Sequence, residues 1–209
     1  MPPTKQSLSK SRLISAWQCP KKLYLETFHP DLAEVSASTE ALFATGHEVG
    51  AIAQATYGTP DSVEIPYGPK MVEATRDLLA SGARFPIFEA TFEHDGILVR
   101  ADVLLPDGDA WRLVEVKAST SVKDYHVLDC AIQEWVLRNA GIDLTSISLA
   151  HVNNQFVYEG DGNYDGLLAE HDLTDEVKTV EPRVEDLVAA TLDDIAHGMP
   201  CVAVGRRCI

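Results

Sequence analysis

The sequence lacks any apolar run of about 18 residues, the length that a helix needs to cross a membrane. Its first residues include lysine and serine but no apolar segment of the kind that forms a secretory signal. Cysteine is scarce, and four residues spread over 209 positions do not resemble the framework of a disulfide-rich secreted domain. These absences argue against a membrane partner and predict a location in the reducing cytoplasm.

Basic side chains are also few, because 17 Lys and Arg against 32 Asp and Glu give a formal net charge of -15. This balance is unusual for a protein that binds nucleic acid through its phosphates. However, residues 1–25 contain five basic residues and no acidic one, which leaves 12 basic and 32 acidic residues elsewhere. Two interpretations stay open: a solubilising acidic surface, or an acidic body with one basic face where a nucleic acid enters.

One domain is expected over residues 1–209, because a chain of this length that is 45% hydrophobic can bury one substantial core. Apolar spacing predicts helices over residues 7–28 (in two parts that meet at Pro20), 36–57, 69–81, 122–140 and 184–197. Alternation and turn residues predict strands over residues 87–92, 97–104, 110–118, 146–152 and 156–159. This order of elements predicts an α/β or α+β sandwich.

One strand of the expected meander carries an acid and an ammonium among apolar neighbours. Glu115 and Lys117 are two positions apart in the run 111–118, so both project from the same face. Burying either charge alone is costly, which indicates a bound cation or an anionic substrate. A second Glu-x-Lys at residues 176–178 has no apolar strand around it, and we interpret it as solvated surface.

The register of the hairpin decides whether Asp102, on the preceding strand, meets Glu115. If Pro106 pairs with Trp111, the two acids lie directly opposite each other, with Cβ atoms about 4.5–5.5 Å apart. If residues 107 and 108 alone form the turn, the acids meet diagonally, whereas a three-residue loop turns Asp102 to the other face. Two carboxylates this close repel each other unless a divalent ion or a shared proton neutralises them, and one or two carboxylates suit Mg²⁺.

Asp102, followed after twelve residues by Glu115-Val116-Lys117 and then by a helix with Gln133, resembles the PD-(D/E)XK nuclease superfamily. Further segments resemble its RecB-like branch, including the CRISPR-associated RecB-like exonucleases: Ser9-Lys10-Ser11, Cys19-Pro20, Gly46-His47, Arg100-Ala101-Asp102 and Ala131-Ile132-Gln133. The resemblance covers residues 7–141, and the order of the motifs is more specific than any one of them. It implies a restriction-endonuclease-like α/β core with a central mixed sheet flanked by helices. The expected parts are a helical N-terminal part (7–60), a catalytic core (85–160) and a C-terminal helix with a cysteine-bearing tail (172–209).

The resemblance also implies a metal site. His47 matches the metal-ligating histidine of the branch, and Asp102 and Glu115 match its metal carboxylates. The carbonyl of Val116 would be a further ligand. The implied cofactor is Mg²⁺ or Mn²⁺, because a histidine among hard oxygen ligands broadens acceptance toward Mn²⁺.

The implied reaction is hydrolysis of a phosphodiester in DNA, in single strands or at ends. Lys117 matches the catalytic lysine, which orients the attacking water or neutralises the transition state. Gln133 and Tyr125 match the helix that contacts the nucleic-acid backbone. The alternative function is a catalytically inactive nucleic-acid-binding module of the same fold, and a third is a scaffolding domain whose acids are ordinary surface.

Each of these residues also has a structural interpretation. Asp102 and Glu115 could be hydrogen-bonded core acids or pair with Arg100, while His47 could be structural and Gln133 simple polar packing. Glu89, on the strand before Asp102, is either a second acid near the site or a surface residue.

Some RecB-like nucleases hold an iron–sulfur cluster through one early and three late cysteines. Cys19 matches the early position, and Cys201 and Cys208 fall late. Cys130 lies inside a predicted helix, where a buried thiol is expected. Four thiolates are the usual requirement for a [4Fe–4S] cluster, so either the chain continues beyond Ile209 within a larger parent protein or the cluster is absent. Partners other than DNA would then be a nuclease–helicase or CRISPR complex.

Overall fold

A mixed sheet of seven strands lies at the centre of the computed structural model, which describes residues 7–33 and 37–201. The strands are β1 (Leu8–Ser9), β2 (Val63–Glu64), β3 (Ile87–His94), β4 (Ile97–Asp107), β5 (Ala110–Lys117), β6 (Leu144–Val152) and β7 (Leu168–Asp172). The order in the sheet is β2-β3-β4-β5-β6-β7, and β1 pairs with β4. The predicted α/β class with a mixed sheet flanked by helices is confirmed.

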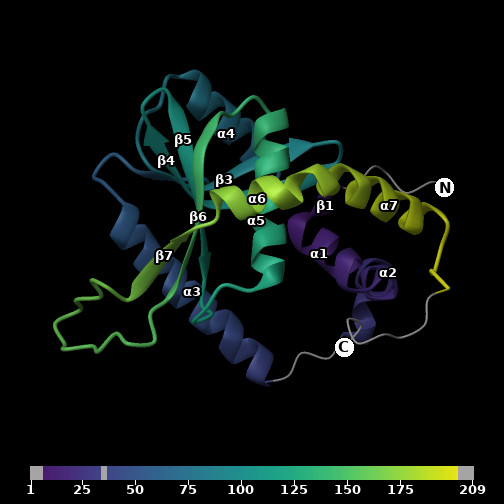
Figure 1. Ribbon diagram of the computed structural model, residues 1–209, viewed down its shortest axis with the longest axis horizontal. Coiled ribbons are helices and arrows are strands. Elements are labelled where there is room, and N and C mark those ends of the chain that lie inside the picture. Colours follow the sequence, from purple (N-terminus) through teal and green to yellow (C-terminus); the bar gives the residue numbers. More distant parts are fainter. Residues whose placement is uncertain (1–6, 34–36, 202–209) are drawn as a thin grey trace.

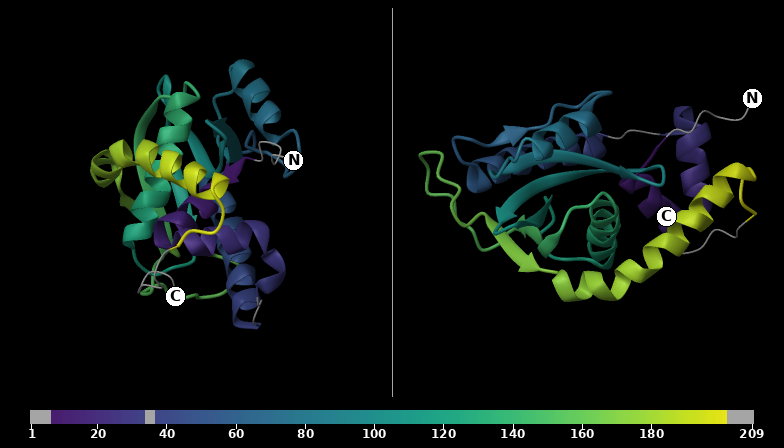
Figure 2. Two further views of the ribbon diagram at one scale, coloured as in Figure 1. Left: turned by 90° about the vertical axis from the view of Figure 1, so that its right-hand side faces the viewer. Right: turned by 90° about the horizontal axis from the view of Figure 1, so that it is seen from above.

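Helices cover both faces of this sheet. They are α1 (Lys10–Gln18), α2 (Pro20–Phe28), α3 (Ala37–Tyr57), α4 (Met71–Ala80), α5 (Asp124–Asn139), α6 (Thr174–Val180) and α7 (Val184–Ala196), with short 3-10 turns at Pro30–Leu32 and Glu181–Arg183. Figure 1 shows α5 against the sheet, with α1 and α2 beside α7. Figure 2 shows α5, α6 and α7 on one side of the sheet and α3 on the other.

The antiparallel meander β3-β4-β5 depends on its two turns. Asp95 (φ 48°) and Gly96 (φ 79°) connect β3 to β4, and two successive residues with positive φ suit the twist of a hairpin. Gly108 and Asp109 form the second turn between β4 and β5. Both turns were predicted near these positions.

Helix α5 connects β5 to β6, which are parallel neighbours and therefore need a crossover. Its buried face includes Ile132 and Val136, both fully buried in the larger apolar cluster. Gly141, with a φ of 84°, follows the helix and lets the chain turn back toward β6. A smaller cluster of Val103, Val114 and neighbouring apolar side chains lies on the α3 side.

Strand β4 has two different neighbours along the edge that faces away from β3. β1 pairs with it at Ile97 and Leu98, and β5 pairs with it from Val103 onward. Residues 99–102 of β4 therefore lie at a fork between β1 and β5. Lys10 directly follows β1. The fork therefore brings Lys10 close to Asp102 and to the end of β5.

Several predicted elements differ from the structure. The strand expected at residues 156–159 is wrong, because this segment belongs to the long connection between β6 and β7. β6 pairs instead with β7, whose polar sequence gave no strand signal. The Glu-x-Lys at residues 176–178 lies on α6, which was not expected, although Glu176 and Lys178 are exposed as predicted. Within the described residues, no helix is both long and apolar enough to cross a membrane.

Candidate functional site

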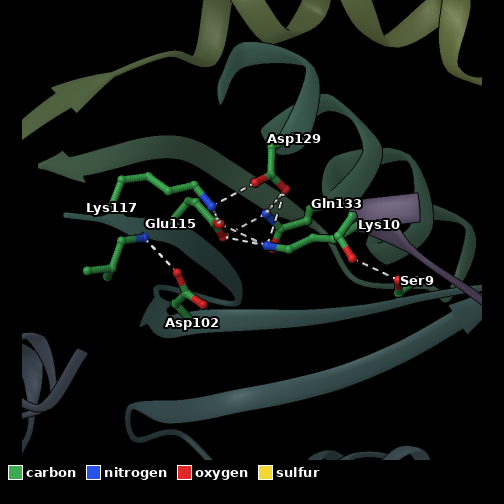
Figure 3. Close-up of polar contacts among 9 residues, drawn as sticks. Ser9, Lys10, Asp102, Glu115, Lys117, Asp129 and Gln133 are labelled. Carbon is green, nitrogen blue, oxygen red and sulfur yellow. Dashed lines mark hydrogen bonds and ion pairs between the residues drawn. The ribbon is translucent and has the colours of Figure 1, made fainter. Parts of the chain in front are cut away.

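The register of β4 and β5 brings Asp102 and Glu115 together. Pro106 pairs with Trp111 and Val103 with Val114, which is the first of the three registers considered above. Continued by one residue, this register sets Asp102 opposite Glu115. The backbone N–H of Val116 donates a 2.7 Å hydrogen bond to Oδ2 of Asp102, which holds this carboxylate against the end of β5 (Figure 3).

The surroundings of Asp102 disfavour the negative charge of its carboxylate. Burial, and then the negative charge of Glu115, raise the pKa of Asp102 to about 7. The charges of Lys10 and Lys117 and the hydrogen bond from Val116 act in the opposite direction. A carboxyl group with such a pKa is favoured as a cation ligand, because a bound cation would restore its ionised form.

Glu115 is fully buried, and its carboxylate is surrounded by donors. Nζ of Lys10 lies 2.8 and 2.9 Å from its two oxygens, and Nε2 of Gln133 donates to Oε2 at 2.7 Å. Lys117 makes a further ion pair with Oε1. Burial alone would raise the pKa of Glu115, but the charges of Lys10 and Lys117 outweigh it and hold the pKa well below its usual range.

Asp129, on α5, is the second acid that the two lysines share. Its oxygens lie 2.8 Å from Nζ of Lys117 and 3.2 Å from Nζ of Lys10, and Gln133 donates to Oδ1 at 3.3 Å. Burial alone would lower the pKa of Lys117, but Glu115 and Asp129 raise it above its usual range. The raised pKa favours the charged form of Lys117.

Sequence reasoning missed the roles of Lys10 and Asp129. In the sequence, Lys10 belongs only to a short motif and to the basic N-terminal segment. Its contact with Glu115 spans 105 positions in the chain. Asp129 did leave a signal, because it precedes Gln133 by one helical turn in an otherwise apolar stretch. Arg100 pairs with Glu89 at 3.2 Å, so the alternative that it neutralises Asp102 or Glu115 is not what the structure shows.

A cavity of about 450 Å³, which we call the acidic cavity, opens between α3 and the sheet beside these residues. Asp102, Val116 and Lys117 line its sheet side, and His47 lines its α3 side. Glu64 and Glu89 also face it, and burial raises the pKa of Glu89 despite its ion pair with Arg100. His47 is exposed, as a residue on the rim of a cavity would be.

The expected metal ligands fit this cavity in part. His47, Asp102 and Val116 line it together, whereas the oxygens of Glu115 point to the two lysines and Gln133. In the part of the chain that the structure describes, no three His, Cys, Asp or Glu side chains already surround one point. For Glu115 to bind a cation in this cavity, its carboxylate would have to give up a contact with a lysine.

The residues expected to contact nucleic acid occupy different surroundings. Gln133 is fully buried between Glu115 and Asp129, and its Oε1 has no hydrogen-bond partner among the described residues. Tyr125 lines a second cavity, on the other side of Lys117. A contact of either residue with DNA stays a prediction.

The cysteines expected at an iron–sulfur cluster are only partly described. Cys19 is buried where α1 meets α2, and Cys201 is exposed at the end of the described chain. Cys208 lies outside the described residues. Cys130 is buried in α5 as predicted, and burial raises the pKa of its thiol.

No protein-family model and no curated protein matches the chain. Among solved structures, one described as "Crystal structure of SSO0001" is similar, with a TM-score of 0.47 and 15% sequence identity. The match covers 88% of this chain and 75% of that chain. A likeness of this extent identifies neither a family nor a function.

Proposed function

We propose that this protein is a divalent-metal-dependent nuclease of the RecB-like type that hydrolyses phosphodiesters in DNA, in single strands or at ends. The observation that carries the proposal is the meeting of Asp102, Lys117 and His47 at one cavity, with Glu115 directly behind it. These are the residue types that the resemblance assigns to metal binding and catalysis, and they come from α3, β4 and β5.

The chemistry follows from the charges of these residues. Asp102, His47 and the carbonyl of Val116 would hold Mg²⁺ or Mn²⁺, which would stabilise negative charge developing on the phosphate oxygens. Lys117 reaches the same cavity as a charged ammonium, so it can neutralise developing negative charge or orient the attacking water. Glu115 and Asp129 fix the position of the Lys117 ammonium.

An oligonucleotide cleavage assay tests this proposal. Purified protein with Mn²⁺ or Mg²⁺ should shorten a fluorescent single strand, and Lys117→Ala should lower the rate by about 10²-fold or more, the range found when one preorganised charge-stabilising group is removed. Lys178→Ala is the matched control, because this exposed lysine lies on α6 and pairs with Asp175 at 3.5 Å. Equal cleavage by wild type and Lys117→Ala would exclude the mechanism.

A second candidate function is a binding module of the same fold that does not cut. It is favoured by the oxygens of Glu115, which two lysines and Gln133 already engage. This function predicts salt-sensitive binding of DNA without any metal-dependent product. With either function, we also propose that the protein is cytoplasmic. We further propose that it belongs to a larger nuclease–helicase or CRISPR complex.

A further inference from the structure

A second cavity, which we call the lysine cavity, lies beyond Lys117 and has a volume of about 380 Å³. It is formed where α1 meets the start of α5 and the end of β5. Lys117 and Ala118 line both this cavity and the acidic cavity, so the two hollows adjoin each other at the end of β5.

The side chains around the lysine cavity are mostly hydrogen-bond donors. Three ammonium groups line it, from Lys10, Lys22 and Lys117. Hydroxyl groups and one amide add further donors, from Ser11, Ser15, Tyr125 and Gln18, whereas the hydroxyl of Ser119 already donates to the carbonyl of Ser121. One carboxylate among the described lining residues, that of Asp129, is held by the ammonium groups of Lys10 and Lys117.

The three lysines differ in how firmly acidic side chains hold their ammonium groups. Lys10 and Lys117 are committed to Glu115 and Asp129 at distances of 3.2 Å or less. Among the described residues, the Lys22 ammonium contacts the side-chain oxygen of Gln18 at 2.9 Å and forms a loose ion pair with Glu26 at 3.9 Å. The Lys22 ammonium is therefore the cation of this cavity that is most available to an anion.

We propose that the lysine cavity binds a phosphate group of the DNA strand whose scissile phosphate lies in the acidic cavity. This inference rests on the proposed function, and it adds a second anchoring point and a path for the strand across the end of β5. Lys22 supplies the main charge, and Ser11, Gln18 and Tyr125 supply hydrogen bonds. The site also explains how a chain of net charge -15 could bind DNA, because the contact falls on its basic N-terminal segment.

Binding without metal tests the site separately from cleavage. A fluorescent 12-nucleotide single strand is titrated in EDTA over a range of salt concentrations, and anisotropy gives the affinity. Lys22→Gln should weaken binding about 3- to 10-fold at low salt and reduce the slope of log K against log [salt] by about 0.7, the value for one lost phosphate contact on a single strand. Lys22→Arg should keep most of the affinity, and Lys178→Gln should match wild type.

The outcomes separate this inference from the proposed function. If Lys22→Gln binds as tightly as wild type, the inference is overturned even if wild type cuts DNA. If Lys22→Gln weakens binding but wild type never cuts with Mg²⁺ or Mn²⁺, the phosphate site stands and the nuclease does not. Inorganic phosphate is the second probe, and binding of phosphate without binding of the oligonucleotide would overturn the assignment to DNA. Because the Lys22 side chain is partly exposed, we expect its variants to fold. Circular dichroism checks the folding of each variant.

Discussion

At the scale of single residues, the site is decided by how five charged groups share one small volume. Asp102, Glu115 and Asp129 are acidic, and Lys10 and Lys117 are basic, so one negative charge is left over among them. Among the described residues, the two lysines pair with Glu115 and Asp129 and not with Asp102, and the raised pKa of Asp102 agrees with an excess of negative charge there. In the proposed function, Asp102, which lines the acidic cavity, is the acid available to the metal ion.

Removal of Lys10 should show how much the protein depends on this arrangement. Lys10→Met leaves Glu115 and Asp129 with one ammonium in place of two, and breaking a buried ion pair typically costs about 3–5 kcal/mol. Because the Lys10 side chain is partly exposed, we expect a loss of about 2–3 kcal/mol in the free energy of unfolding, measured with urea.

Lys178→Met is the control for this measurement. Its pair with Asp175 is exposed, and exposed pairs typically contribute less than about 1 kcal/mol. Equal losses in the two variants would mean that the buried network around Glu115 contributes no more than an ordinary surface contact.

At the scale of elements, the site depends on how β3, β4 and β5 end or bend beside it. Glu89 lies on β3 between the residue pairs Phe88–Val103 and Ala90–Ala101, at the level of Asp102. Its φ of 58° is rare for a residue with a side chain, and it falls where Glu89 lines the acidic cavity. Local strain at this position is therefore part of how the cavity is built.

Glycine and alanine at position 89 should report this strain. Glu89→Gly should be more stable than Glu89→Ala by about 1 kcal/mol in urea unfolding, because only glycine adopts positive φ without penalty. Glu93, on the same strand with an ordinary backbone conformation, is the matched position. There the order should reverse, with alanine about 0.5–1 kcal/mol more stable than glycine. The same order at both positions would contradict the conformation of Glu89.

The start of α5 gives the protein a dependence on pH. His126 is buried, and its Nδ1 accepts a hydrogen bond from the backbone N–H of Lys123 at 3.2 Å. Burial, with the charge of Lys117 as a second cause, lowers the pKa of His126 to about 4. The folded protein therefore keeps this imidazole neutral, whereas the unfolded chain protonates it below a pH of about 6.5.

The sign of the effect follows from this difference. As the pH falls from 7 to 5, the unfolded state takes up a proton that the folded state does not, so the free energy of unfolding decreases. We expect wild type to lose about 1–2 kcal/mol more over this interval than His126→Gln, measured by urea unfolding at each pH. Parallel pH profiles for the two proteins would show that His126 is not held neutral.

At the scale of the whole molecule, the excess of negative charge affects the free energy of unfolding. A net charge of -15 opposes folding through repulsion, and the sequence pI is about 4.7. At pH 7, raising NaCl from 0.05 to 0.5 M should increase the free energy of unfolding by about 1 kcal/mol, because salt screens exposed charges more than buried pairs. The same salt step near pH 4.7 should have little effect, and a salt response that is equal at both pH values would contradict this account.

The sequence by itself determined much of the framework. The turns at Asp95-Gly96 and near Gly108, and the alternation in the runs around Asp102 and Glu115, predicted the meander correctly because turn chemistry and strand periodicity are local properties. The helix before Gly141 was predicted for the same reason. The strand β7 was missed because its polar side chains leave no periodic signal and its pairing with β6 is a contact at a distance.

Only the tertiary structure decided how the candidate site is assembled. The sequence placed Asp102, Glu115 and Lys117 on neighbouring strands, but the register between those strands stayed open until the backbone pairing settled it. Lys10 reaches Glu115 because β1 pairs with β4 at the fork, and no local pattern encodes a contact across 105 positions. Buried charges must find partners wherever the fold brings them, and their partners are therefore a property of the folded chain and not of any segment.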